Sequence, residues 1–263
     1  QENISGLIID LRSNGGGSLS EALELTGLFI DRGPIVQTKD ASGRVDINYD
    51  PEPGIIYPGP LAVLVDRNSA SASEIFAGAI QDYRRGIIVG EPTFGKGTVQ
   101  NVVNLNNFIE DSDEDHGRLK TTIAQFFRVS GGSNQHKGVI PDIIFPTAVY
   151  SSDQGESAYE NALPWDQVKP ARYYPSNAPV EQFEIAKILH EKRIKQNKLF
   201  QLLMDDLNVK RDASNRKEIS LLESKRKKQR EELLTARKDI QNAMRVEKGL
   251  PPLDDIKEEL KSS

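Results

Sequence analysis

The sequence contains no cysteine, and this absence excludes disulfide bonds, a cysteine nucleophile and thiolate metal ligands. Histidine is scarce, with only His116, His136 and His190. None of them lies in a context typical of a catalytic triad, although spacing alone does not exclude one. No apolar run approaches the roughly 20 residues that a membrane-spanning helix needs. A catalytic base, if there is one, therefore has to be sought beyond the commonest choice.

What is present is a rather polar chain of 263 residues, with 37% hydrophobic and 28% charged residues and a formal net charge of −5. This length allows one large domain or two ordinary ones. No signal peptide is visible, yet Gln1 is not a natural start and a strand-like run follows almost at once. We therefore expect a fragment of a longer protein whose targeting segment is missing.

Residues 66–100 hold the densest concentration of unusual features. The apolar run 61–65 predicts a buried strand, and residues 75–83 recur at helical spacing. Between them lie five small residues, Ser69 to Ser73. The serines thus occupy a strand-to-helix junction, where unpaired helical N–H groups and the helix dipole favour a developing anion. This position suits a serine nucleophile, although a Ser/Ala run before a helix is more often a cap with close packing.

The same stretch supplies a lysine between two glycines, Gly95-Lys96-Gly97, with Gln100 four residues later. A lysine that is desolvated enough to lose its proton can act as a general base. In an extended segment, Lys96, Thr98 and Gln100 share one face, so Gln100 could hold the amine without adding charge. The competing interpretation is an ordinary solvated glycine turn.

Taken together, several motifs resemble one known family. They are DLRSNGGG at 10–17, SASASEIFAGAIQDY at 69–83, VGEPTFGKGTVQ at 89–100, KGVIPDIIFPT at 137–147 and NALPWD at 161–166. This set resembles the carboxyl-terminal processing peptidases, which include the tail-specific proteases of the bacterial periplasm. The resemblance extends over the whole chain.

The resemblance implies an α/β fold with a crotonase-like serine peptidase core and a mostly helical C-terminal region. It implies a serine endopeptidase that degrades or trims proteins from their C-termini and needs no metal or cofactor. Carried over by motif, Ser71 becomes the nucleophile, Lys96 the general base and Gln100 the residue that orients it. Backbone N–H groups of Gly15, Gly16 and Ala72 would form the oxyanion hole, and Asp82 is a possible supporting residue. The alternative is a non-catalytic scaffold or binding protein.

The resemblance also implies partners and a location. The expected partners are protein or peptide substrates with exposed C-termini, the N-terminal and PDZ regions of the same protein, and an adaptor protein. Family members carry a PDZ domain before this region, and nothing here resembles one, so we expect activity to depend on the missing region. The expected location is the periplasm. Nucleic acid is not expected, because the basic segment 217–248 is interspersed with acidic residues and lacks aromatics for stacking bases.

Three other patterns point to weaker alternatives. Residues 90–96 match the G-x-x-x-x-G-K of a phosphate-binding loop, but the run TVQNVV at 98–103 predicts a strand where such a loop must open a helix. The three glycines at 15–17 fit the dinucleotide fingerprint poorly and suggest a tight turn. The acidic loop 110–115 lacks the glycine and the final carboxylate of an EF-hand, so we interpret it as a solvated loop.

Composition changes near residue 147, and this predicts a catalytic core at 1–147 and a helical region at 148–263. Within the core, residues 6–11 predict a strand buried on both faces, and residues 19–29 a helix. Further strands are expected at 35–38, 45–49, 86–89, 121–129, 139–140 and 143–145. Long helical patterns cover 181–207 and 217–248.

Overall fold

A computed structural model describes the chain except for residues 1–3, 51, 109–113, 148–153, 176–179 and 255–263. The chain divides into two compact units, residues 1–145 with 151–183, and residues 146–150 with 184–263. The acidic loop discussed above falls largely on 109–113 and so lies outside the described residues. None of the described helices is long and apolar enough to cross a membrane.

The first unit contains a parallel sheet of four strands in the order β1-β4-β5-β8. These are β1 (Leu7–Asp10), β4 (Leu61–Val65), β5 (Ile87–Gly90) and β8 (Ile143–Ile144). β4 lies between β1 and β5 and pairs in parallel with both, Leu61 facing Leu7 and Ala62 facing Ile87. The predicted strands at 61–65 and 86–89 are thereby confirmed. Parallel strands need crossover connections; the one from β4 to β5 contains a helix at 72–82, and the one from β5 to β8 contains two further strands.

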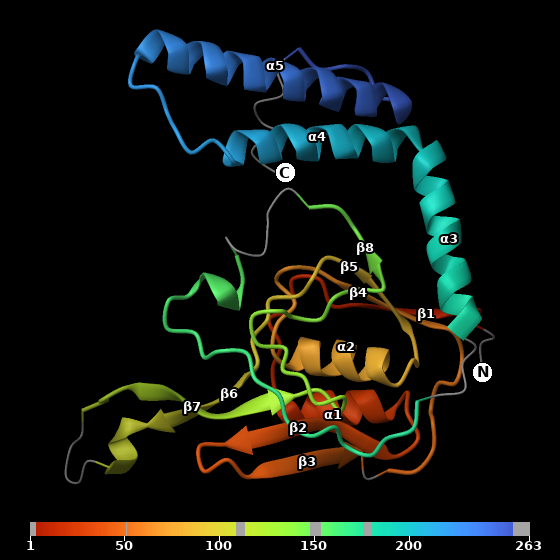
Figure 1. Ribbon diagram of the computed structural model, residues 1–263, viewed down its shortest axis with the longest axis vertical. Coiled ribbons are helices and arrows are strands. Elements are labelled where there is room, and N and C mark those ends of the chain that lie inside the picture. Colours follow the sequence, from red (N-terminus) through yellow and green to blue (C-terminus); the bar gives the residue numbers. More distant parts are fainter. Residues whose placement is uncertain (1–3, 51, 109–113, 148–153, 176–179, 255–263) are drawn as a thin grey trace. The chain divides into compact units, whose positions relative to one another are not determined.

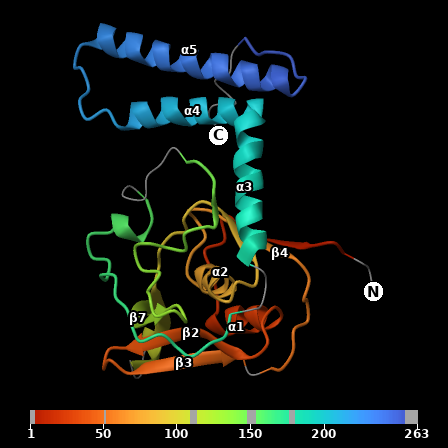
Figure 2. The ribbon, with the colours of Figure 1, turned by 45° about the vertical axis from the view of Figure 1, so that its right-hand side comes forward.

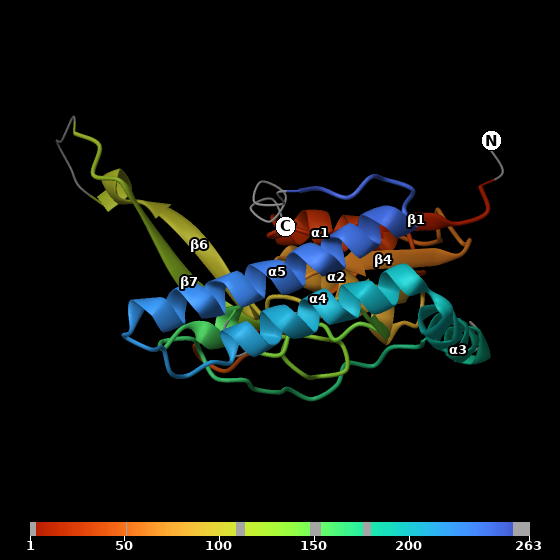
Figure 3. The same ribbon diagram turned by 90° about the horizontal axis from the view of Figure 1, so that it is seen from above.

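A second sheet is antiparallel, in the order β3-β2-β7-β6. It consists of β2 (Gly33–Asp40), β3 (Val45–Asp50), β6 (Thr98–Asn104) and β7 (Arg118–Phe127). β6 and β7 extend as a long ribbon away from the rest of the sheet (Figures 1 and 3). Their register shifts between Val99 and Gln100. A short 3-10 helix, η1 (Leu105–Phe108), follows β6.

Two helices lie between the sheets, α1 (Leu19–Gly27) and α2 (Ala72–Asp82) (Figures 1 and 2). α2 is apolar on both sides because it packs against both sheets. On one side, Phe76 and Ile80 join Val63 and Ile88 of the parallel sheet. On the other side, a second cluster includes Ile75, Ala79, Ile35, Val36 and Phe126. Every residue from Ser73 to Ile80 is buried, so the helix is fixed along its length.

The strand predicted at 6–11 exists, but the expectation that it is buried on both faces is wrong. β1 is an edge strand, and Ile8 is 67% exposed. An apolar run reads as fully buried only when elements cover both faces of its sheet. In the described residues of this unit, one face of β1 is left uncovered.

Two other expectations differ from the structure. Only Ile143–Ile144 of the apolar pieces at 139–145 forms a strand, and Val139 is a buried loop residue instead. The helical pattern 181–207 is two helices, α3 (Val180–Gln196) and α4 (Lys198–Ser214). Asn197 caps α4 by accepting a hydrogen bond from the N–H of Phe200 at 2.8 Å, which ends one helix and begins the next.

In the second unit, α4 lies side by side with α5 (Glu223–Glu247) (Figure 3). Asp206 is the buried charge between them, only 2% exposed. Its carboxylate pairs with Arg237 of α5 at 3.1 Å and with Lys210 of α4 at 3.1 Å. A buried carboxylate without such partners would be strongly destabilising, so these pairs specify how the two helices meet.

Residues 154–175 return to the first unit and cross its surface. The segment contains the short helix η2 (Glu156–Ala158). Trp165 donates its indole N–H to the carbonyl of Ser133 at 2.9 Å, and Asp166 forms an ion pair with Lys39 of β2. Ala171 and Tyr173 pack on the cluster that contains α2. This part of the chain therefore belongs structurally to the first unit.

Candidate active site

Ser71 lies at the N-terminus of α2 with φ 58° and ψ −115°. A positive φ is uncommon for a residue other than glycine, and such strain clusters at functional sites. The side chain is half-buried. Because Ser71 precedes the first helical residue, the N–H of Ala72 has no intrahelical acceptor, whereas the N–H groups of Ser73 and Glu74 donate to the carbonyls of Ala70 and Ser71.

The three serines of this junction differ in what their hydroxyl groups do. Ser69 donates to the carbonyl of Leu11 at 2.7 Å and Ser73 donates to the carbonyl of Asn14 at 3.1 Å. Both are buried and serve the packing of the junction. Within the described residues, the Ser71 hydroxyl donates to no carbonyl, so its proton remains available to a base.

The glycine loop after β1 reaches the same place. A Cβ at Gly16 would lie 2.9 Å from the Cβ of Ser71 and 2.5 Å from the carbonyl oxygen of Ala70, so only glycine fits there. The N–H of Gly16 donates to the side-chain oxygen of Asn14 at 2.9 Å. In the described part of the chain, the N–H groups of Gly15 and Ala72 have no acceptor. The loop and the helix terminus thus offer two free donors near Ser71.

Glu74 connects the Ser71 segment with the Lys96 segment. Its carboxylate is fully buried and accepts four hydrogen bonds. One oxygen accepts from the backbone N–H groups of Ser71 at 2.8 Å and Lys96 at 2.9 Å. The other accepts from the Thr93 hydroxyl at 2.5 Å and the Gly95 N–H at 2.8 Å. The two backbone segments are therefore held together by a single side chain.

Burial raises the pKa of Glu74 to about 7, and the four donors act against this rise because they favour the ionised form. The four hydrogen bonds match the ionised form, which predominates above about pH 7. The Thr93 hydroxyl accepts from the N–H of Val139 at 2.7 Å and can therefore direct its own proton to Glu74. In the ionised form, each carboxylate oxygen receives two donors.

Lys96 lies in the loop between β5 and β6 and is half-buried. Burial lowers the pKa of its amine below the usual range, and the positive charge of Lys120 lowers it further. The carboxylates of Glu156 and Glu74 act in the opposite direction. A lowered pKa raises the neutral fraction of the amine, which is the form that can accept a proton. No hydrogen bond joins the Lys96 amine to the Ser71 hydroxyl in the described structure.

Gln100 and Asp82 form no contact with Ser71 or Lys96 among the hydrogen bonds and ion pairs of the described residues. β6 begins only at Thr98, which is buried, whereas Gln100 is exposed beyond the register shift. The described residues include no hydrogen bond between Gln100 and Lys96. Asp82 ends the 11-residue helix α2, about 16 Å from its start at about 1.5 Å per residue. There it pairs with Arg128 at 2.7 Å.

Among the described residues, Ser71 forms no hydrogen bond with a histidine. His136 donates its backbone N–H to the carbonyl of Gly95 at 2.9 Å, and its Nε2 is buried without a partner among the described residues. His190 lies on α3 in the second unit. The backbone N–H of His116 donates to Asn106 in the β6–β7 ribbon.

The loop that carries Lys96 is supported from its outer side by residues 155–163. The N–H of Glu156 donates to the carbonyl of Phe94 at 3.0 Å. The side chain of Gln135 accepts from the N–H of Gly97 at 2.8 Å and donates to the carbonyl of Leu163 at 2.8 Å. Gln135 is fully buried. The loop is thus bracketed by α2 on one side and by this crossing segment on the other.

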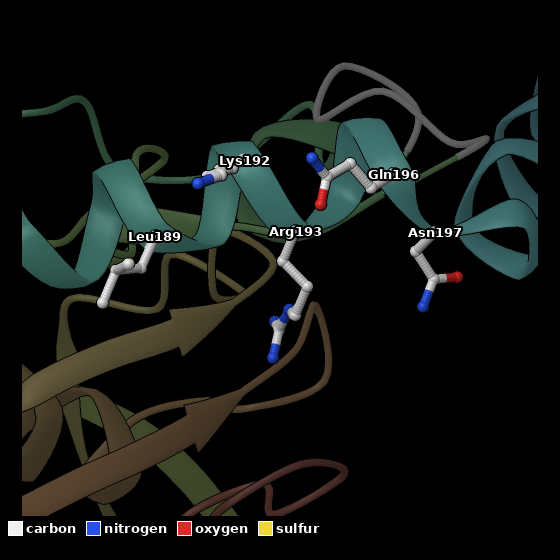
Figure 4. A pocket seen from close by; sticks show the side chains of 5 residues that line it. All are labelled: Leu189, Lys192, Arg193, Gln196 and Asn197. Atoms are coloured by element: carbon white, nitrogen blue, oxygen red, sulfur yellow. The ribbon is translucent and has the colours of Figure 1, made fainter.

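The structure also bears on three other kinds of site, namely a nucleotide-binding loop, a metal site and a pocket on α3. Residues 90–97 are followed directly by the strand β6, so the nucleotide-binding alternative is wrong. Among the described residues, no group of three or more acidic or histidine side chains could hold a metal ion. A pocket at the C-terminal part of α3 is lined by basic and polar side chains and by Leu189, which points to the same side as Arg193 and Asn197 (Figure 4). It contains no acid–base pair.

The residues that our sequence reasoning missed are Glu74, Thr93 and Gln135. Only Glu74 carries a local signal. Serine followed three residues later by glutamate is a capping-box pattern, and the structure shows the Glu74 half of it. The bonds from Glu74 to Thr93, Gly95 and Lys96 depend on tertiary structure, and no local pattern indicates them.

Two protein families and several known proteases are similar to this chain in sequence. Residues 1–145 match the model of peptidase family S41, and residues 149–263 match the C-terminal domain of tail specific protease (DUF3340). The chain is 44% identical over 97% of its length to a tail-specific protease of Haemophilus influenzae and covers 38% of that protein. It is 38% identical over 54% of its length to a carboxy-terminal-processing protease of Bartonella bacilliformis and covers 31% of it.

Among solved structures, the photosystem II D1 C-terminal processing protease is 37% identical, with a TM-score of 0.47. The match covers 54% of this chain and 35% of that one. This chain spans well under half the length of each of these relatives. The family model matches more than half of the chain. The chain therefore belongs to peptidase family S41.

Proposed function

We propose that the protein containing this chain is a serine endopeptidase in which Ser71 is the nucleophile and Lys96 the general base. The observation that carries the proposal is the shared hydrogen-bond acceptor. One oxygen of Glu74 binds the backbone N–H groups of both residues. Two residues with complementary chemistry, 25 positions apart, are held side by side at the N-terminus of a buried helix. A solvated glycine turn would not require this arrangement.

In the proposed reaction, neutral Lys96 accepts the proton of the Ser71 hydroxyl as Oγ bonds to the scissile carbonyl carbon. The carbonyl oxygen becomes an oxyanion, stabilised by the N–H groups of Ala72 and Gly15. Because Gly16 has no side chain, the glycine loop can lie close to Ser71. The Lys96 ammonium then gives its proton to the leaving amine as the C–N bond breaks. An ester on Ser71 remains.

Hydrolysis of the ester repeats the proton transfers with water. Lys96 accepts a proton from the water as its oxygen bonds to the ester carbonyl. Collapse of the second tetrahedral intermediate releases the carboxylic acid and returns the proton to Ser71 Oγ. Neither Gln100 nor Asp82 takes part in a bond-making or proton-transfer step of the proposed reaction. Gln100 is retained as a residue that orients the amine when substrate is bound, and Asp82 as a residue that stabilises the far end of α2 through Arg128.

The names of the relatives support protein substrates processed at or from their C-termini, and we propose the same substrates for this protein. We further propose a periplasmic location and a dependence on the rest of the longer protein, with a PDZ region and an adaptor as expected partners. The share of each relative that the chain covers is the reason for the dependence. Residues 1–147 would contribute the catalytic groups and residues 148–263 the helical region, with 155–163 supporting the base loop.

The test is cleavage of a protein substrate by the full-length protein carrying Ser71→Ala, Lys96→Ala or Lys96→Arg. Each should abolish cleavage while leaving the fold intact, because arginine carries its charge at all accessible pH values and cannot act as a base. Ser73→Ala is the matched control, since it removes a neighbouring hydroxyl that donates to a carbonyl. Retained cleavage by Lys96→Arg, or loss by Ser73→Ala equal to that by Ser71→Ala, would contradict the proposal.

A further inference from the structure

One hollow in the first unit lies away from the site just discussed. It is a pocket of about 650 Å³ formed by α1, the end of β3 and residues 52–56. Neither Ser71, Glu74 nor Lys96 lines it. Its volume is within the range of about 300–1,000 Å³ that is usual for ligand sites. Nothing in the proposed peptidase reaction uses it.

Asp50 is the buried member of the lining, only 5% exposed. One carboxylate oxygen accepts from the N–H of Glu52 at 3.1 Å. The other oxygen is buried and has no hydrogen-bond partner among the described residues. No lysine or arginine in the described part of the chain forms an ion pair with Asp50. Buried carboxylate oxygens are normally satisfied, so this one indicates a missing donor.

The position of the carboxyl group is fixed by its neighbours. A Cβ at Gly27 would lie 2.7 Å from the Asp50 carboxyl carbon, so the group packs directly against the last turn of α1. Asp50 is also the end of β3 and pairs with Gly33 of β2. The free oxygen therefore cannot easily turn away to find another partner.

The rest of the lining combines negative charge with apolar surface. Glu24 and Glu52 are exposed at the pocket, and none of the lining residues is cationic. Leu28, Tyr49 and Ile56 are 41%, 52% and 77% exposed, which is unusual for large apolar side chains in one hollow. A ligand that fits this lining needs a positive charge at the end of an apolar stem.

We propose that this pocket binds a lysine side chain carried by an apolar peptide segment. The free oxygen of Asp50 is covered in the ligand-free state, so the ammonium would displace the side chains over it and then donate to it, and the four-carbon stem would lie along the apolar wall. Lysine fits better than arginine because a guanidinium prefers both oxygens of a carboxylate. Here one of the two is already occupied by the N–H of Glu52. The proposal goes beyond the peptidase activity and does not depend on it.

The test uses three short peptides on the unaltered 263-residue chain, labelled with ¹⁵N at glycine. The peptides are N-acetyl-Leu-Lys-Leu-amide and its counterparts with norleucine or arginine in place of lysine. We expect saturable shifts of the Gly27 and Gly54 amide signals, which both line the pocket, and none at Gly43. The lysine peptide should bind about tenfold more tightly than the norleucine peptide, as expected for a charge-assisted hydrogen bond.

Variants then test the role of the carboxylate. Asp50→Asn should reduce binding of the lysine peptide to the level of the norleucine peptide. Asp46→Asn is the matched control, because Asp46 lies on the same strand but is exposed and pairs with Arg44. If Asp50→Asn fails to fold, Ile56→Ser tests the apolar wall and should weaken binding of the lysine and norleucine peptides alike.

Several outcomes would overturn the assignment. They are equal affinities for the lysine and norleucine peptides, absence of saturable shifts at Gly27 and Gly54, and unchanged binding by Asp50→Asn. Tighter binding of the arginine peptide than of the lysine peptide would overturn the choice of lysine. The comparison of peptides on the unaltered chain holds even if no variant can be prepared.

Discussion

At the scale of single residues, the Lys96 amine lies among charges of both signs. The ammonium of Lys120 lowers its pKa, and the carboxylate of Glu156 raises it. Both charges lie outside the proposed reacting groups. They therefore offer a way to move the pKa of the base without touching Ser71 or Lys96.

Glu156→Gln and Lys120→Gln should shift the pH–rate profile in opposite directions. Removing the carboxylate destabilises the ammonium, so the rising limb should move to lower pH. Removing the neighbouring ammonium should move it to higher pH. The measurement is kcat/KM for a peptide substrate as a function of pH in the full-length protein. Shifts in the same direction, or profiles that overlay the parent, would show that Lys96 is not the titrating base.

The raised pKa of Glu74 predicts that the free energy of unfolding depends on pH. Its pKa in the folded protein is raised to about 7 from about 4.5, so the folded state binds this proton more tightly than the unfolded state does. The resulting stabilisation is complete below about pH 4.5 and is lost as the pH rises through about 7. The parent should therefore lose on the order of 1–3 kcal/mol between about pH 5 and pH 8 that Glu74→Gln does not lose.

Urea unfolding of both proteins at the two pH values gives this difference directly. Glu21→Gln is the control, because Glu21 is exposed on α1. If the free energy of unfolding of parent and Glu74→Gln changes equally with pH, the carboxyl group does not titrate in this range. Four hydrogen bonds would then have outweighed burial.

At the scale of elements, the strands and helices that short stretches of sequence determine could be predicted from the sequence. The strand at 61–65 and the helical spacing at 75–83 were predictable because an apolar run and a 3.6-residue period each lie within one short window. The exposure of Ile8 was not, because it depends on whether another element covers β1. The break at Asn197 carries a weak local signal, an asparagine at a helix start.

The candidate site likewise contains residues that motifs predict and residues whose roles depend on contacts between distant segments. Ser71 and Lys96 were predicted from motif resemblance, and the structure brings their backbone N–H groups to one oxygen of Glu74. Glu74 was missed because three of its four donors come from residues 93–96, about twenty positions away. The role of Gln135 depends on a segment that crosses the unit after residue 154. Contacts of this kind are set by the packing of distant segments.

Gln135→Ala should lower kcat about tenfold with little change in KM. The loss removes the acceptor of the Gly97 N–H and the link to Leu163, so the Lys96 loop is held less firmly, at a cost of about 1–3 kcal/mol for the unsatisfied donor. Asn101→Ala, an exposed residue on β6, is the control. A rise in KM with unchanged kcat would place Gln135 in substrate binding instead of base positioning.

At the scale of the whole molecule, the boundary of the S41 match at residue 145 differs from the boundary of the first compact unit. Residues 151–183 lie beyond the match but belong to that unit. They supply the ion pair of Asp166 with Lys39 and the packing of Ala171 and Tyr173 on the core. Stability of the core should therefore depend on them.

A chain of residues 1–183 should unfold cooperatively, whereas one of residues 1–147 should not. Both keep every strand of the two sheets, but only the longer one keeps the contacts with the base loop. Circular dichroism during thermal unfolding tests this contrast, with the 263-residue chain as reference. A chain of residues 1–147 as stable as that of 1–183 would show that the crossing segment contributes nothing to the fold.

The central claim is that neutral Lys96 activates Ser71, and covalent labelling measures this most directly. A fluorophosphonate reacts with an activated serine, and intact mass with peptide mapping identifies the residue. In the full-length protein, we predict that Ser71 is labelled at a rate that rises with pH as Lys96 loses its proton. Lys96→Arg should abolish the labelling at every pH. Labelling of Ser71 in Lys96→Arg at the parent rate, or a rate independent of pH, would contradict the account.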